Sequence, residues 1–203
     1  LDCIFFRKDP PVNHEYITLL QMLKELEYQN TLVLNSPSSL LHFNEKILGY
    51  RLSKPKVPTI IGNNFKNIKK LLSEYGEIVL KPINLMAGNG IIKVHDKKGS
   101  DATIKDYIKK YKMIIAQKYL KNIKNGDNRI IIYNGILEKN VLTRYPPEND
   151  FRANLACGGS YEIKQINSKY VPLLEEVASF LKYHGIFFAG IDMIGEYITE
   201  INI

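Results

Sequence analysis

The stretch GIDMIGEYITEINI, residues 190–203, reads as two apolar strands joined by a tight turn. Glu200 and Asn202 are two positions apart, so their side chains point to the same face of a strand. A three-residue turn over 195–197 would place Asp192 opposite Glu200 on that face, whereas a two-residue turn would place it on the other face. Oxygen ligands of this kind suit Mg²⁺. The alternative is an acidic, solvent-exposed face on an edge hairpin.

A second stretch, LKPINLMAGNGIIKV at residues 80–94, reads as a strand, a small-residue loop and another strand. Lys81 lies where the first strand ends, and the loop contains Gly88 and Gly90. Glycines allow backbone N–H groups to approach an anion while a lysine supplies charge, which predicts phosphate binding. The spacing does not match a P-loop. The alternative is a solvated lysine at a strand end.

The segment PPENDFRANLACGGS, residues 146–160, has no hydrophobic period and is rich in proline and glycine. We expect residues 145–160 to form a mobile lid loop. Arg144 precedes it and Arg152 lies inside it, and arginines of this kind can close a site over an anion. Asp127 and Arg129 precede a hairpin at Asn134–Gly135. Each of these side chains could equally be a surface residue.

The remaining elements follow from periodicity and capping. Asn13 and Ser100 are the expected helix caps. The predicted helices span 15–28, 39–48, 67–75, 101–111 and 168–183, and the predicted strands include 4–6, 31–34, 59–61, 113–117, 187–194 and 198–203. The region KPKVP at residues 54–58 reads as a linker between two units.

Composition limits the class of protein. The 203 residues are 45% hydrophobic, with two cysteines and a net charge of +7. No apolar run is long enough to span a membrane, and the cysteines are too few for a disulfide framework, so we expect a cytoplasmic protein. The lysines are dispersed, which favours an anionic small molecule over nucleic acid as the partner.

Together these segments resemble the ATP-grasp enzymes, and more closely the prokaryotic-type glutathione synthetases. The resemblance rests on RKDPP (7–11), NEK (44–46), LKP (80–82), AQKYL (116–120), NGDNRIII (125–132), TRYPPENDFRANLACGG (143–159) and GIDMIGEYITEINI (190–203). It implies an α/β (α+β) ATP-grasp fold, in which two subdomains hold the nucleotide between antiparallel sheets. Residues 1–55 would be the remnant of an α/β N-terminal domain with its linker, 56–120 the small ATP-binding subdomain, and 121–203 the larger subdomain.

The resemblance also implies roles for matching positions. Nucleotide contacts are implied for Lys46, Lys81, Met86, Gly88, Gly90, Gln117, Lys118, Tyr119, Leu120, Asp127 and Arg129. Arg144, Arg152 and Asn154 would form the catalytic set that holds the transferred group and the peptide substrate. Asp192, Glu200 and Asn202 would bind two Mg²⁺ ions, with Mn²⁺ as a substitute.

The implied reaction joins γ-glutamylcysteine to glycine through an acylphosphate, giving glutathione, ADP and phosphate, in a homo-oligomer when full length. Another ATP-grasp carboxylate–amine ligase and an inactive ATP-binding fragment are the alternatives. Family members carry glycines where this chain has Leu85 and Ala87, and commonly an arginine where it has Ser160. Leu85 and Ala87 tolerate positive φ poorly, so we expect a different loop conformation or weaker nucleotide binding. Members of this family also have further residues before the position of RKDPP and after that of EIN, so we expect this chain to be the middle part of such an enzyme.

Overall fold

A computed structural model describes residues 2–203, apart from the side chain of residue 156. The chain forms two compact units. One contains the residues up to Pro55 together with Asn122–Ile203, and the other contains Lys56–Lys121. No helix among the described residues is long and apolar enough to cross a membrane.

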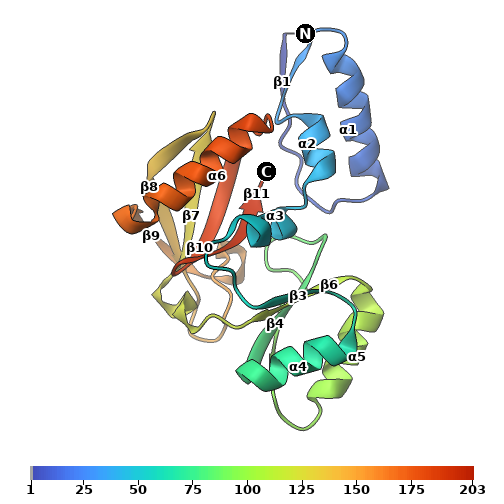
Figure 1. The fold of residues 1–203 in the computed structure, drawn as a ribbon, viewed down its shortest axis with the longest axis vertical. Helices are drawn as coiled ribbons and strands as arrows, with labels where there is room; N and C mark the ends of the chain where they lie inside the picture. The colour runs from blue at the N-terminus through green and yellow to red at the C-terminus, as the bar shows by residue number, and fades with distance from the viewer. Residues whose placement is uncertain (1) are drawn as a thin grey trace. The chain divides into compact units, whose positions relative to one another are not determined.

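The first unit is built on a five-stranded antiparallel sheet in the order β11-β10-β7-β8-β9. Its strands are β7 (Asp127–Tyr133), β8 (Ile136–Tyr145), β9 (Ser160–Gln165), β10 (Phe188–Ile194) and β11 (Tyr197–Asn202). Helix α6 (Val171–Tyr183) lies across this sheet (Figure 1). Leu174 and Leu181 of α6 share a core with Ile130, Ile132 and Ile191 of the sheet. One face of the sheet is therefore buried under a helix, and the alternate residues point to the other face.

The N-terminal part of this unit alternates strands and helices. A short parallel pair, β1 (Cys3–Phe5) and β2 (Leu32–Leu34), flanks α1 (His14–Glu27), and α2 (Pro37–His42) and α3 (Glu45–Leu52) follow. As predicted, Asn13 caps α1, because its side chain accepts a hydrogen bond from the N–H of Tyr16 at 2.9 Å. Three short 3₁₀ helices, Lys121–Asn125, Leu155–Cys157 and Ser168–Tyr170, complete the connections.

The second unit is a four-stranded antiparallel sheet in the order β3-β6-β4-β5, with two helices on one face. Its elements are β3 (Thr59–Gly62), α4 (Phe65–Tyr75), β4 (Glu77–Pro82), β5 (Ile92–His95), α5 (Ser100–Tyr111) and β6 (Ile114–Lys118). Ile78 and Leu80 of β4 pack with Ile68 of α4 and Ile104 of α5. Lys81 follows Leu80, so its side chain belongs to the other face of the sheet, away from α4 and α5.

Two helix predictions are wrong in detail. The expected helix over 39–48 is divided into α2 and α3, because Phe43 and Asn44 are extended. The Asn44 side chain accepts hydrogen bonds from the N–H groups of Lys46 and Ile47 at 3.1 and 3.2 Å and so begins a new helix. Ser100 is not the cap of α5: Gly99 holds that position with φ 92°, and Ser100 is the buried first residue of the helix.

The β7–β8 and β10–β11 hairpins of the large sheet each combine a two-residue turn with a shift of register. Asn134 and Gly135 have φ of 48° and 75°, as the predicted two-residue turn requires. In the β10–β11 hairpin the turn also holds two residues, since Ile194 pairs with Tyr197. A bulge after Asp192 then shifts the register by one position, so Asp192 nevertheless faces Glu200. The three-residue turn was not needed to bring these side chains to one face.

Candidate active site

The face of the large sheet that points away from α6 carries a row of charged side chains. Asp127 and Arg129 come from β7, Arg144 from β8, Asp192 from β10 and Glu200 from β11. Strand pairing places Asp192 between its two cross-strand neighbours, Arg129 and Glu200. Residues that are far apart in the sequence are thus brought together by register. The alternation of GIDMIGEYITEINI predicts that Glu200 and Asn202 share this face, whereas it leaves the side of Asp192 open.

Asp192 is the centre of this row and is 6% exposed. Arg129 binds it in a bidentate manner, through Nε to Oδ1 and through NH2 to Oδ2 at 2.8 Å. NH2 of Arg144 lies 2.9 Å from Asp192 Oδ1 and 2.5 Å from Asp127 Oδ2. Burial alone would raise the pKa of Asp192, but the hydrogen bonds and charges of the two arginines outweigh it and lower this pKa below its usual value. Asp192 is therefore held as a carboxylate.

A second ion pair extends the row to β11. Lys46 Nζ of α3 lies 2.8 Å from Glu200 Oε1, and the Lys46 side chain is 8% exposed. Asn202 Nδ2 donates to the carbonyl of Gly190 at 2.9 Å and to Asp192 Oδ2 at 3.3 Å. Lys46 thus pairs with one of the three predicted metal ligands, Glu200, and a hydrogen bond joins the other two, Asn202 and Asp192.

The three predicted ligands have the chemistry of a magnesium site. Two carboxylates and a carboxamide offer the hard oxygen atoms that Mg²⁺ prefers, and Mg²⁺ commonly completes its shell with water and phosphate oxygens. Among residues 2–203 no group of three or more His, Cys, Asp and Glu side chains is arranged to hold a metal by itself. A metal here would therefore need oxygen atoms from outside the three side chains. The buried Nε of Arg144 makes no hydrogen bond with the described residues, which leaves one unused donor on this charged face.

Gly190 is a site residue that the sequence analysis missed. A Cβ atom at this position would lie 2.8 Å from Cδ and 3.3 Å from Nε of Arg129. The Arg129 side chain therefore lies over Gly190 on its way to Asp192. A glycine inside a strand often marks such a close approach, and this was the available signal.

In the second unit, Lys81 belongs to a hydrogen-bonded row on the sheet face that points away from α4 and α5. Its Nζ donates to Gln117 Oε1 at 2.9 Å, and Gln117 Nε2 donates to Thr59 Oγ1 at 3.0 Å. The row crosses β4, β6 and β3, so two of the predicted nucleotide contacts, Lys81 and Gln117, are brought together.

The loop after Lys81 is shaped by backbone turns. The N–H of Asn89 donates to the carbonyl of Met86 at 3.0 Å, and the N–H of Ile91 donates to that of Gly88 at 3.2 Å. Gly88 and Gly90 have φ of 75° and 73°, and Ala87 has φ 55°. Ala87 therefore takes the left-handed conformation that L-residues with a Cβ disfavour. The loop accommodates this residue instead of avoiding the conformation.

The other predicted residues make different contacts. Lys118 makes a cation–π contact with Tyr75, with its Nζ 4.8 Å from the ring centroid. The N–H of Tyr119 donates to the carbonyl of Glu77 at 3.1 Å. Leu120 follows them and is partly buried. Arg152, in the loop between β8 and β9, binds Asp150, with NH2 2.6 Å from Oδ2. Asn154 in the same loop accepts a backbone hydrogen bond from Cys157 at 2.8 Å.

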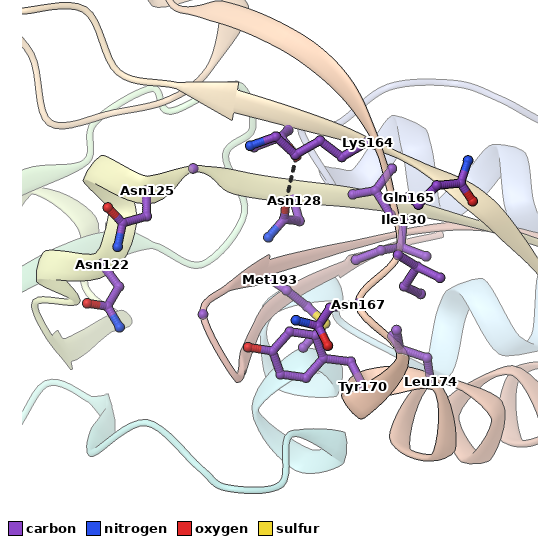
Figure 2. A pocket seen from close by; sticks show the side chains of 15 residues that line it. Asn122, Asn125, Asn128, Ile130, Lys164, Gln165, Asn167, Tyr170, Leu174 and Met193 are labelled. Carbon is purple, nitrogen blue, oxygen red and sulfur yellow. Dashed lines mark hydrogen bonds between the residues drawn. The ribbon is translucent and has the colours of Figure 1, made fainter.

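A cavity of about 340 Å³ lies on the opposite side of the large sheet (Figure 2). Its polar lining includes Asn122, Asn128 and Tyr170, and its apolar lining includes Met193 and Leu174. None of the predicted site residues lines it. This cavity is therefore separate from the charged face.

Solved structures identify the class of fold. D-cycloserine synthetase DcsG matches with a TM-score of 0.72 at 12% identity, over the whole of this chain and 75% of that one. D-alanyl-alanine synthetase A from Vibrio cholerae matches with a TM-score of 0.68 at 18% identity, over the whole of this chain and 67% of that one. An ATP-grasp ligase, PsnB, complexed with its minimal precursor matches with a TM-score of 0.68 at 19% identity, over 98% of this chain and 69% of that one. The fold is that of the ATP-grasp proteins, as predicted.

Sequence comparisons identify the family. The family model described as prokaryotic glutathione synthetase, ATP-grasp domain, matches residues 45–203, and the corresponding N-terminal domain model matches residues 1–40. The chain is 38% identical to glutathione synthetase of Wigglesworthia glossinidia brevipalpis and 36% identical to that of Prochlorococcus marinus, over its whole length. It spans 65% and 66% of those proteins. The chain belongs to the prokaryotic glutathione synthetase family.

Proposed function

We propose that the protein of which these residues are a part is a glutathione synthetase, which ligates γ-glutamylcysteine to glycine with ATP and Mg²⁺. The observation that carries this proposal is the paired row of charges on the large sheet, in a chain that matches its family from end to end. The row offers cations to phosphate and oxygen ligands to a metal on one face. The other face of the same sheet packs apolar side chains against α6.

Each unit would supply its own contacts to ATP. In the first unit, Lys46, Arg129 and Arg144 would pair with phosphate oxygens, and Asp127 would contact the ribose. In the second, Lys81 and the N–H groups of the loop over 86–90 would contact phosphate, while the strand over 117–120 would line the adenine.

When ATP and Mg²⁺ bind, they would take the place of the ion-pair partners that the charged side chains have in the free protein. Asp192, Glu200 and Asn202 would hold Mg²⁺, which supplies positive charge to the transferred phosphoryl group when it is bound. The arginines and the lysine that now neutralise these carboxylates would turn to the phosphate oxygens. Every buried charge would thus keep an opposite charge beside it, which is a requirement for burying charge at low cost.

In the reaction, the C-terminal carboxylate of γ-glutamylcysteine attacks the γ-phosphorus atom of ATP and ADP leaves. The amine of glycine then attacks the carbonyl carbon of the acylphosphate, an amide bond forms, and phosphate leaves with the former carboxylate oxygen. Arg144 would stabilise the negative charge that develops on the transferred group. Arg152 and Asn154, in the loop between β8 and β9, would hold the peptide substrate and help to exclude water from the acylphosphate.

The experiment that tests the proposal measures ADP release by the full-length protein with ATP and Mg²⁺, omitting γ-glutamylcysteine or glycine in turn. Release that needs both substrates, with glutathione as the product, is expected. Release with another pair of amino acids would instead identify a different carboxylate–amine ligase. ATP binding without any turnover would identify an ATP-binding protein that has lost catalysis.

A further inference from the structure

Helix α3 runs along the outer edge of β11. In the strand order β11-β10-β7-β8-β9, β11 is an edge strand, so half of its backbone N–H and C=O groups point away from the ladder. Figure 1 draws α3 beside this strand, and both belong to the first unit. The same strand presents Glu200 and Asn202 to the charged face.

The two ends of α3 bind the two ends of β11. Glu45, the first residue of the helix, accepts a hydrogen bond from the N–H of Ile203 at Oε1, at 3.0 Å. Ser53, which caps the other end of the helix, accepts one from the N–H of Ile198 at Oγ, also at 3.0 Å. The Ser53 hydroxyl in turn donates to the carbonyl of Pro55 at 2.6 Å, which fixes its orientation. Two outward N–H groups of the edge strand are satisfied in this way.

The middle of α3 touches the backbone of β11. A Cβ atom at Gly49 would lie 2.9 Å from Cα and 3.0 Å from N of Glu200, closer than real Cβ contacts. A glycine inside a helix is less favourable than alanine by about 1 kcal/mol, so its presence here needs a local reason. The reason is the contact with the backbone of Glu200 itself.

The three contacts have one geometry. Residues 45, 49 and 53 are spaced by four and therefore lie on one face of the helix. They contact 203, 200 and 198, so helix and strand run in opposite directions. Lys46, beside Glu45, reaches the Glu200 carboxylate at 2.8 Å.

We propose that α3 is a clamp that fixes β11, and that Glu45, Gly49 and Ser53 are positioning residues for the oxygen ligands Glu200 and Asn202. None of the three is proposed to touch metal or substrate. The link from strand position to metal binding rests on the proposed function. The hydrogen bonds and the close approach that define the clamp do not.

The test compares Glu45→Ala with Glu45→Gln in the full-length protein. Glutamine keeps a side-chain oxygen that can accept the Ile203 N–H, whereas alanine removes it. Ile47→Ala, at an exposed position of the same helix, is the matched control. The first readout is amide hydrogen exchange at Ile203, and the second is Mn²⁺ binding in the presence of ADP, followed by electron paramagnetic resonance.

Glu45→Ala is expected to speed exchange at Ile203 and to weaken Mn²⁺ binding, each by about fivefold to tenfold, the effect of one lost hydrogen bond. Glu45→Gln and Ile47→Ala should stay near wild type. Gly49→Ala should weaken Mn²⁺ binding as well, although alanine favours helices.

Three results would overturn the clamp. They are unchanged exchange at Ile203 in Glu45→Ala, faster exchange with unchanged Mn²⁺ affinity, or a Glu45→Gln variant as impaired as Glu45→Ala. Wild-type protein that binds Mn²⁺ with ADP but forms no glutathione would disprove the ligase function and leave the clamp supported. The two failures are therefore distinguishable.

Discussion

The two units present their polar residues in opposite ways. On the large sheet, Arg129, Arg144 and Asp192 form a largely buried network in which each carboxylate already faces a cation. In the smaller unit, Lys81 is joined to a neutral amide, and the loop that follows it is shaped by backbone turns and left-handed residues. Side-chain charges organise the first face, whereas backbone conformation organises the second. Substitutions should therefore affect charge balance in one unit and loop geometry in the other.

The largest effect is expected from Asp192→Asn. The substitution leaves two arginines without their shared carboxylate, and breaking a buried ion pair costs about 3–5 kcal/mol. We expect turnover to fall by about three orders of magnitude or more, because both metal binding and the positions of the arginines are lost. Steady-state kinetics and urea unfolding measure the two losses.

Asp96→Asn is the matched control for Asp192→Asn, since Asp96 pairs with Lys69 at the surface of the smaller unit. It should leave turnover and stability near the wild-type values. Wild-type turnover in Asp192→Asn would show that the buried network has no catalytic role.

Glu200→Gln should separate catalysis from stability. The Glu200 side chain is 25% exposed and pairs with one lysine, so the loss of stability should be smaller than for Asp192. We expect turnover to fall by about 100-fold and the Mg²⁺ requirement to rise, because glutamine is a weaker metal ligand. A magnesium titration of turnover measures this, with Glu176→Gln, a surface ion-pair residue, as control. An unchanged Mg²⁺ requirement would contradict the metal assignment.

Lys81→Ala tests the corresponding residue of the smaller unit. The substitution removes a charge-assisted contact to phosphate, and we expect the KM for ATP to rise by about tenfold or more with little change in stability. Lys97→Ala, at an exposed position in the same unit, is the control. A KM for ATP equal to that of the control would place Lys81 outside the nucleotide site.

The smallest effect is expected from Ala87→Gly. Glycine removes the strain of a left-handed alanine, but it also makes the unfolded chain more flexible, so a net gain of about 0.5–1 kcal/mol is expected. Asn134→Gly is the comparison in the larger unit, where asparagine already tolerates positive φ, and its gain should be smaller. Thermal unfolding of both variants measures the difference. A less stable Ala87→Gly protein would show that the loop conformation is not strained.

Features set by neighbouring residues could be predicted from the sequence, whereas features set by remote contacts could not. Alternation in GIDMIGEYITEINI was enough to place Glu200 and Asn202 on one face, and Asn134–Gly135 was enough to place a hairpin. The bulge after Asp192 could not be predicted, because it depends on pairing with a neighbouring strand. Gly49 and Gly190 were also missed, since their function is to leave room for atoms that are remote in the sequence.

The helix caps were predicted only in part, since Ser100 proved to be the first residue of α5 and not its cap. Asn13 begins α1 as expected, but the cap at Asn44 interrupts an apolar period that reads as one continuous helix. Ala87 differs from both, because the loop holds it in a left-handed conformation that alanine disfavours.

The most direct test of the ligase mechanism follows an oxygen atom. The full-length protein is given γ-glutamylcysteine labelled with ¹⁸O in both oxygens of its C-terminal carboxylate, together with glycine, ATP and Mg²⁺, and the phosphate released is analysed by mass spectrometry. Activation of the carboxylate through an acylphosphate predicts one ¹⁸O atom in each phosphate and one retained in the new amide. Unlabelled phosphate, released while glutathione is formed, would contradict the mechanism.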